Sequence, residues 1–317
     1  MRIILTLLLT TSALPALARD CPEGQRLFDH AAGSDCVPVD PQRIVTLQDQ
    51  NALLPLLELG VRPIASAGHV LPDGSVTYRR TDGFDTDGIA FVGVYGAPDR
   101  EAVAAQAPDL VIASPWPDGA YELYSPIAPT VIIDPFDQPL EDALMQIADL
   151  VGRTAVAEAL RAETWDHAES LRARLGDTLE RASLSFLEPD LAAGVVYPEN
   201  GTQAAGAAFR MLGLTRVPEQ EAIAPGDWPE VSYEALGDHS GDVLFVNTYG
   251  GDVGAQEFAT FVAHPIVAVL PSVAAGQVVR LDGDAAVGAS WGKIRNFMDQ
   301  IAAGLDREYL NLDLVAE

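Results

Sequence analysis

The order of strand-like and helix-like segments is the feature that most limits how this chain can fold. From Pro41 onward, short runs rich in β-branched and apolar residues alternate with helical stretches. Repeated alternation of this kind favours mainly parallel sheets covered by helices. A helix is expected over residues 51–59, ended by Gly60. The strand-like runs of the first half are residues 43–47, 63–66, 90–94, 109–113 and 130–134.

A long stretch without strand character divides the chain. Residues 140–182 carry apolar side chains at helical spacing, interrupted by Gly152. Thr154 is suited to cap a new helix, with Glu158 in its first turn. A helix over residues 154–182 would be about 43 Å long at about 1.5 Å per residue. We expect this helix to be a spacer between two lobes.

The alternation resumes after the spacer and predicts a second lobe. Strands are expected at residues 192–197, 242–247 and 277–281, and helices at 204–212, 233–236 and 293–304. The predicted fold class is α/β, with two lobes that each hold a mainly parallel sheet with flanking helices, joined by one long rigid backbone helix. The expected divisions are a signal peptide at 1–18, a leader at 19–40, an N-terminal α/β lobe at 41–138, the backbone helix region at 139–185 and a C-terminal α/β lobe at 186–317.

The first eighteen residues have the order of a secretory signal peptide. A basic start at Arg2 is followed by an apolar run over residues 3–9 and by the small-residue exit Ala16-Leu17-Ala18. This run is too short for a membrane anchor, because spanning a bilayer takes about 20 apolar residues. We therefore expect export, cleavage after Ala18 and a soluble protein that acts outside the cytoplasm.

The only two cysteines, Cys21 and Cys36, lie just after the predicted cleavage point. In an oxidising compartment, a close pair of cysteines most simply forms a disulfide, which here would pin the N-terminal leader. There is no Cys-x-x-Cys motif that would indicate redox or metal chemistry. Arg19 and Asp20 before Cys21 are also poor residues for a lipid attachment site, so we expect an untethered chain.

Charge and histidine content exclude several kinds of partner. The chain has 19 basic and 46 acidic residues, a formal net charge of −27, which repels nucleic acid. Lys293 is the only lysine, so a cationic ligand clamp must be built mainly from arginine. A bare metal ion would need several converging ligands, and no such cluster is expected. The histidines outside the leader are scattered, at positions 69, 167, 239 and 264.

Several ordered segments resemble one family. They are residues 43–47 with 56–64, 91–93 with 101–112, 127–131, 231–236 with 242–246, and 264–278. Over residues 41–305 this order is similar to the periplasmic receptors of ABC importers with a rigid helical backbone, which serve ferric siderophores, haem and cobalamin. The resemblance implies a ligand cleft between the lobes, no enzymatic activity and no resident cofactor. It also implies that a monomer delivers an iron chelate to a permease. Glu101 and Glu234 would dock onto arginines of that permease. Alternatively, both acids only stabilise the start of a helix through its dipole.

Candidate ligand residues follow from the rule that ligands lie beyond the carboxyl ends of parallel strands. Aromatic walls and a guanidinium suit a bulky, often anionic ferric siderophore. Arginines 79 and 80 could instead be solvated surface residues, and Trp228 could serve packing. Haem and cobalamin stay open as ligands, because they use similar clefts. The expected ligand-binding residues are Tyr95, Trp116, Tyr121, Arg79, Arg80, Arg210, Trp228, Tyr249 and Trp291.

An alternative from another class is a serine hydrolase. Residues 288–292 read Gly-Ala-Ser-Trp-Gly and fit the G-x-S-x-G pattern, between a predicted strand and a predicted helix. That fold places its acid and its histidine after the serine, and no histidine follows Ser290. We therefore expect a binding protein and no catalytic residue.

Overall fold

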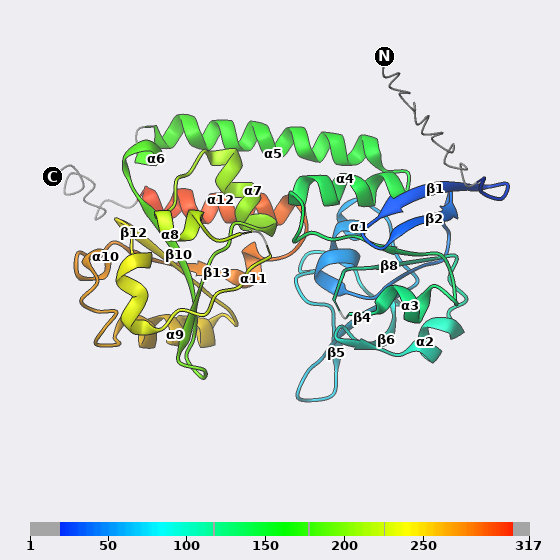
Figure 1. The fold of residues 1–317 in the computed structure, drawn as a ribbon, viewed down its shortest axis with the longest axis horizontal. Coiled ribbons are helices and arrows are strands. Elements are labelled where there is room, and N and C mark those ends of the chain that lie inside the picture. Colours follow the sequence, from blue (N-terminus) through cyan, green and yellow to red (C-terminus); the bar gives the residue numbers. More distant parts are fainter. Residues whose placement is uncertain (1–19, 117, 177, 225, 307–317) are drawn as a thin grey trace, which may run out of the picture.

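The computed structural model describes residues 20–306, except residues 117, 177 and 225. Two α/β lobes lie side by side, and one long helix, α5 (Thr154–Leu175), runs along both of them (Figure 1). This arrangement confirms the predicted fold class. The predicted signal peptide lies outside the described residues. Within the described part of the chain, no helix has the length and apolar character needed to cross a membrane.

The N-terminal lobe is built on a sheet with the strand order β7-β6-β4-β3-β8-β9, and β5 pairs with β4. Its inner strands are parallel, and β3 and β8 are buried along their whole length, as their apolar sequences predict. The strands are β3 (Ile44–Thr46), β4 (Ala65–Val70), β5 (Val76–Thr77), β6 (Ala90–Val94), β7 (Ala97–Pro98), β8 (Leu110–Ala113) and β9 (Thr130–Ile132). The helices are η1 (Asp49–Leu53), α1 (Leu54–Glu58), α2 (Arg100–Ala105) and α3 (Ala120–Tyr124).

The C-terminal lobe has a sheet with the order β11-β10-β12-β13, in which only β11 is antiparallel to its neighbour. The strands are β10 (Leu184–Asp190), β11 (Val195–Pro198), β12 (Val243–Thr248) and β13 (Val278–Asp282). The helices are α7 (Gln203–Leu212), α8 (Pro218–Glu221), η2 (Tyr233–His239), α9 (Asp252–Val262), α10 (Pro271–Ala274), α11 (Gly283–Ala286) and α12 (Trp291–Leu305).

Strand β10 is missing from the strands expected from sequence. Its residues include Pro189, which normally argues against an inner strand because proline cannot donate a ladder hydrogen bond. Here Pro189 lies past the four residues that pair with β12, so the parallel ladder loses no bond. Strand β10 therefore contains Pro189, although local sequence preference alone would argue against a strand at this position.

The backbone helix region consists of α4 (Leu140–Leu150), α5 and α6 (Thr178–Arg181). Helix α5 has 22 residues, about 33 Å at the usual rise, so the expected helix over residues 154–182 is too long. It ends at Gly176, whose positive φ of 51° interrupts the helix. The expected cap at Thr154 is also wrong. Arg153 occupies the N-cap position, and Thr154 is already the first helical residue. No acidic residue lies in the first turn.

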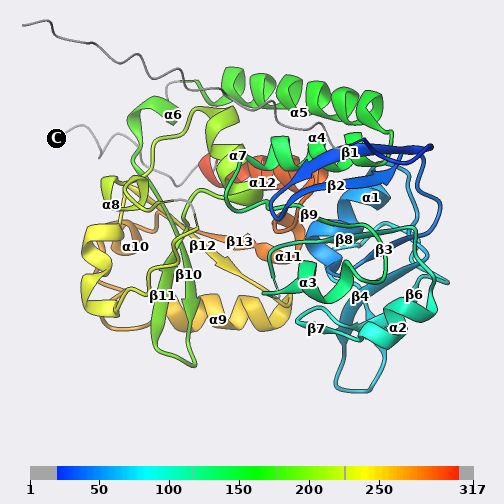
Figure 2. The ribbon, with the colours of Figure 1, turned by 45° about the vertical axis from the view of Figure 1, so that its right-hand side comes forward.

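The predicted disulfide between Cys21 and Cys36 is present, and it closes a hairpin of β1 (Gln25–His30) and β2 (Gly33–Pro38). Figure 2 shows this hairpin beside α4, away from the C-terminal lobe. Phe28 and Val37 insert into the core of the N-terminal lobe. The leader is thus a folded part of that lobe.

Replacement of both cysteines by serine should lower the free energy of unfolding by about 3 kcal/mol, because the bridge restricts a loop of about 15 residues in the unfolded chain. Urea unfolding of the double variant measures this loss. An unchanged midpoint would mean that Phe28 and Val37 hold the hairpin without the bridge.

Candidate functional site

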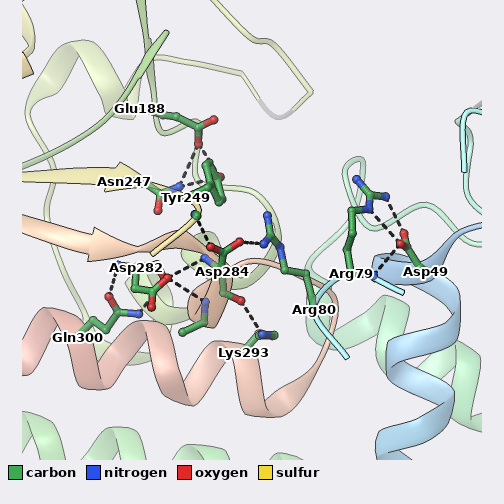
Figure 3. A network of polar contacts seen from close by, with 12 residues as sticks. Asp49, Arg79, Arg80, Glu188, Asn247, Tyr249, Asp282, Asp284, Lys293 and Gln300 are labelled. Carbon is green, nitrogen blue, oxygen red and sulfur yellow. Dashed lines mark hydrogen bonds and ion pairs between the residues drawn. The ribbon is translucent and has the colours of Figure 1, made fainter. Parts of the chain in front are cut away.

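The two lobes meet through side chains that follow the ends of strands (Figure 3). The segment between β5 and β6 brings Arg79 and Arg80 from the N-terminal lobe. Arg80 has a φ of 64°, a left-handed conformation that few residues other than glycine adopt. The two neighbouring arginines diverge: Figure 3 shows Arg79 turned to Asp49 in its own lobe and Arg80 turned to Asp284 in the other lobe.

Arg79 is held by a fully buried carboxylate. Its Nε and Nη2 donate to the two Asp49 oxygens at 3.0 and 2.6 Å, and its backbone N–H donates to Asp49 Oδ2 at 2.9 Å. The guanidinium also lies over the ring of Tyr95, with Cζ at 3.7 Å from the ring centre. The Nε1 of Trp116 lies near Gly96, 4.0 Å from where a Cβ would stand. Arg79 and Tyr95 are therefore in contact on the N-terminal side of the junction, and Trp116 lies beside the residue that follows Tyr95.

Arg80 links the two lobes. It forms an ion pair with Asp284, and its guanidinium lies 5.0 Å from the ring centre of Tyr249. Asp284 is held in place because its Oδ2 accepts a 2.5 Å hydrogen bond from the Gly250 N–H. Burial lowers the pKa of the Arg80 guanidinium. Its Nε is buried and has no hydrogen-bond partner among the described residues.

Beside Arg80, three polar side chains of the C-terminal lobe form a closed network. The Tyr249 hydroxyl donates to Glu188 Oε2 at 2.7 Å. Asn247 Nδ2 donates to the same oxygen at 3.0 Å and to the Tyr249 hydroxyl at 2.8 Å. Burial raises the pKa of Glu188, and burial together with that carboxylate strongly raises the pKa of Tyr249. The phenol therefore stays protonated and can donate to the carboxylate.

A narrow cavity of about 70 Å³ opens next to this network. Its lining includes Glu188, Glu199, Trp228, Asn247 and Tyr249, and a smaller extension of about 20 Å³ shares the first four of them. Burial, and after it the charge of Glu188, raises the pKa of Glu199 to about 7. The cavity thus contains two carboxylates that both resist ionisation.

Some of the expected ligand residues lie elsewhere. Arg210 Nη2 binds Glu141 Oε2 on α4 at 2.5 Å. Tyr121 packs against His30 of the leader hairpin, with ring centres 5.6 Å apart. Trp291 is 1% exposed and belongs to the core of the C-terminal lobe, so its ring does not line an open cavity. Each of these side chains is engaged in packing or pairing that the linear sequence did not indicate.

Of the other expected residues, Arg79 lies over Tyr95 and Arg80 lies beside Tyr249. Trp116 is 56% exposed on the N-terminal side and Trp228 is 53% exposed beside the cavity. The sequence reasoning missed Glu188, Glu199, Asn247 and Asp284. Asn247 ends an expected strand, so the strand-end rule could have included it, whereas Glu188 depends on a strand that was not recognised.

The G-x-S-x-G segment has a structural role as a helix start. The Ser290 hydroxyl accepts a 3.0 Å hydrogen bond from the Lys293 N–H and caps α12. The Glu58 carboxylate, from the N-terminal lobe, accepts from the Trp291 and Gly292 N–H groups at 2.8 and 2.7 Å. In the described part of the chain, Ser290 has no histidine as a hydrogen-bond partner, and no group of three or more His, Cys, Asp or Glu could hold a metal ion.

Two lobes that share a helical support and meet through polar and aromatic side chains form the architecture of a two-lobe ligand-binding protein. The chain belongs to the periplasmic binding protein family, whose model matches residues 48–285. It is 27% identical over 236 residues to the probable siderophore-binding lipoprotein YfiY of Bacillus subtilis, covering 72% of this chain and 70% of YfiY.

Two further relatives extend the comparison. The petrobactin-binding protein YclQ of Bacillus subtilis is 26% identical over 255 residues, covering 78% of this chain and 76% of YclQ. The crystal structure of Staphylococcus aureus SirA complexed with staphyloferrin B matches with a TM-score of 0.73 at 21% identity, covering 90% of this chain and 99% of SirA. The likeness to SirA establishes a common fold.

The raised pKa of Glu199 predicts how stability depends on pH. Between its ordinary value of 4.5 and about 7, the folded protein binds this proton more tightly than the unfolded chain does, so stability falls as pH rises through this window. Glu199→Gln should raise the melting temperature at pH 8 by about 5 °C and change little at pH 5. Glu158→Gln, at an exposed position on α5, is the control. Equal effects at both pH values would contradict the assignment.

Proposed function

We propose that this protein captures a ferric siderophore at the junction of its lobes and delivers it to the permease of an ABC importer, without catalysing a reaction. The observation that carries the proposal is the Arg80 guanidinium where the lobes meet, because its buried Nε lacks a hydrogen-bond partner among the described residues. Metal-bound oxygens of a chelate are anionic acceptors that suit charge-assisted hydrogen bonds from arginine. The siderophores named for YfiY, YclQ and SirA support the same class of ligand.

In this proposal, chelate oxygens take the place of the Asp284 carboxylate on Arg80. Tyr95 and Trp116 on one side and Trp228 on the other supply apolar walls for the organic part of the ligand. The ion pair of Arg79 with Asp49 keeps Tyr95 in position and contributes little net charge.

We infer that the protein works as a soluble monomer in the periplasm after removal of its signal peptide. YfiY is named a lipoprotein, whereas the Cys21 thiol here is consumed by the disulfide with Cys36 and cannot also carry a lipid. Glu101 and Glu234, one in each lobe, are exposed in the first turns of α2 and η2. They are the residues proposed to dock onto permease arginines.

The ligand class can be tested by tryptophan-fluorescence titration with ferric siderophores, ferric citrate, haem and cobalamin. At least one ferric siderophore should saturate the protein, and Arg80→Gln should weaken its binding by about 10- to 100-fold, because a charged hydrogen bond to a buried ligand is lost. Arg62→Gln is the matched control, since Arg62 forms an exposed ion pair with Asp85 outside the cavity. Saturation by haem or cobalamin alone would contradict the proposal.

The docking role predicts a separation of transport from binding. Reversing both charges, with Glu101→Arg and Glu234→Arg, should abolish uptake of the chelate by cells while ligand affinity stays unchanged, because neither side chain is among the residues that line the cavity. The exposed Glu122 and Glu219, reversed in the same way, provide one control position in each lobe. Normal uptake by the first double variant would refute the docking assignment.

A further inference from the structure

The lining of the cavity beside Tyr249 includes several hydrogen-bond acceptors. Glu188 and Glu199 contribute carboxylates from the ends of β10 and β11, and Asn247 contributes its amide from β12. The Tyr249 hydroxyl already donates to Glu188. An incoming ligand therefore meets acceptors that need donors.

The unpaired acceptor is the oxygen of Asn247. The amide nitrogen of Asn247 faces Glu188 and Tyr249 and donates a hydrogen bond to each of them. This orientation leaves Oδ1 as the atom without a partner among the described residues, on a side chain of a residue that is only 9% exposed. Buried acceptors are rarely left unpaired, so this atom indicates a missing donor.

The cationic side chains around the cavity are already engaged. Arg80 pairs with Asp284 in the junction. Arg216, which faces Glu199 from the segment before α8, pairs with Glu221 at 3.2 Å and donates to the Glu199 carbonyl at 2.6 Å. The negative charge of the two cavity carboxylates is therefore only partly balanced.

We propose that this cavity binds a protonated amine carried by the iron chelate, so that the protein prefers ferric siderophores with a cationic arm over anionic tris-catecholates. An ammonium group has three N–H donors, which match Glu188, Glu199 and Asn247 Oδ1. A volume of about 70 Å³ is too small for a whole chelate and suits an aminoalkyl end. Trp228 adds an aromatic face that attracts a cation.

The two parts of the junction would then divide the ligand between them. Arg80 faces the iron-bound oxygens of the chelate, and the cavity about Glu188 and Glu199 holds the cationic end. This inference rests on the proposed function, because it assigns a chemical class to the chelate bound at that site.

The test compares two probes with the same iron centre. Ferrioxamine B is a linear ferric trihydroxamate that ends in a primary amine, which carries a positive charge when protonated. In its N-acetyl derivative this amine is a neutral amide. Titration of the intact protein at pH 8 should show at least tenfold tighter binding of the amine form. Glu199→Gln should remove most of this preference. Arg62→Gln, outside the cavity, should leave both affinities and the preference intact.

The same titrations at pH 6 separate a charge contact from a purely structural role of Glu199. Its carboxylate is mostly ionised at pH 8 and mostly protonated at pH 6, so the preference for the amine should fall about fivefold to tenfold on acidification, and Glu199→Gln should lose this pH dependence.

The outcomes distinguish the inference from the proposed function. The inference would be overturned, and the proposed function would stand, if the two forms bound equally or the acetylated form bound more tightly. The same holds if a ferric tris-catecholate bound and neither form of ferrioxamine B did. Failure of every ferric chelate to bind would count against the proposed function itself.

Discussion

Both lobes build part of their cores from the same two helices, and the rest of the structure depends on this shared packing. Leu140 and Leu144 of α4 belong to the core of the C-terminal lobe, while Ile147 of the same helix belongs to that of the N-terminal lobe. Helix α5 divides similarly, with Ala157 in one core and Leu171 in the other. Separating the lobes would expose apolar surface from both cores, so their relative motion is limited.

Because the lobes are held together, charges at their junction are shielded from water and need partners. Asp49 pairs with Arg79, Asp284 with Arg80, and Glu58 accepts the first N–H groups of α12. These contacts satisfy groups that would otherwise be costly to bury. Among the described residues, Arg80 Nε and Asn247 Oδ1 are two of the buried polar atoms that lack a partner, and we place the ligand beside them.

Short sequence patterns were reliable only where their consequences are local. The strand-end rule led to Tyr95 and Tyr249, because parallel strands end along the same edge of a sheet. Arg79 and Arg80 were chosen instead for their charge, in the polar stretch between two predicted strands. The same kind of local reading suggested a nucleophile at Ser290. That serine and its flanking glycines instead begin a helix, since a small polar residue at a strand-to-helix turn suits either role.

The sequence by itself determined the α/β class, the strand-free middle segment, most strands and the disulfide, because each follows from periodicity or from spacing along the chain. Only the tertiary structure decided that Arg210 binds Glu141, that Trp291 is a core residue and that Glu188 and Glu199 share one cavity. Partner choice depends on which groups meet through space after both lobes have packed. Burial then sets the protonation of those groups, and no local pattern records either effect.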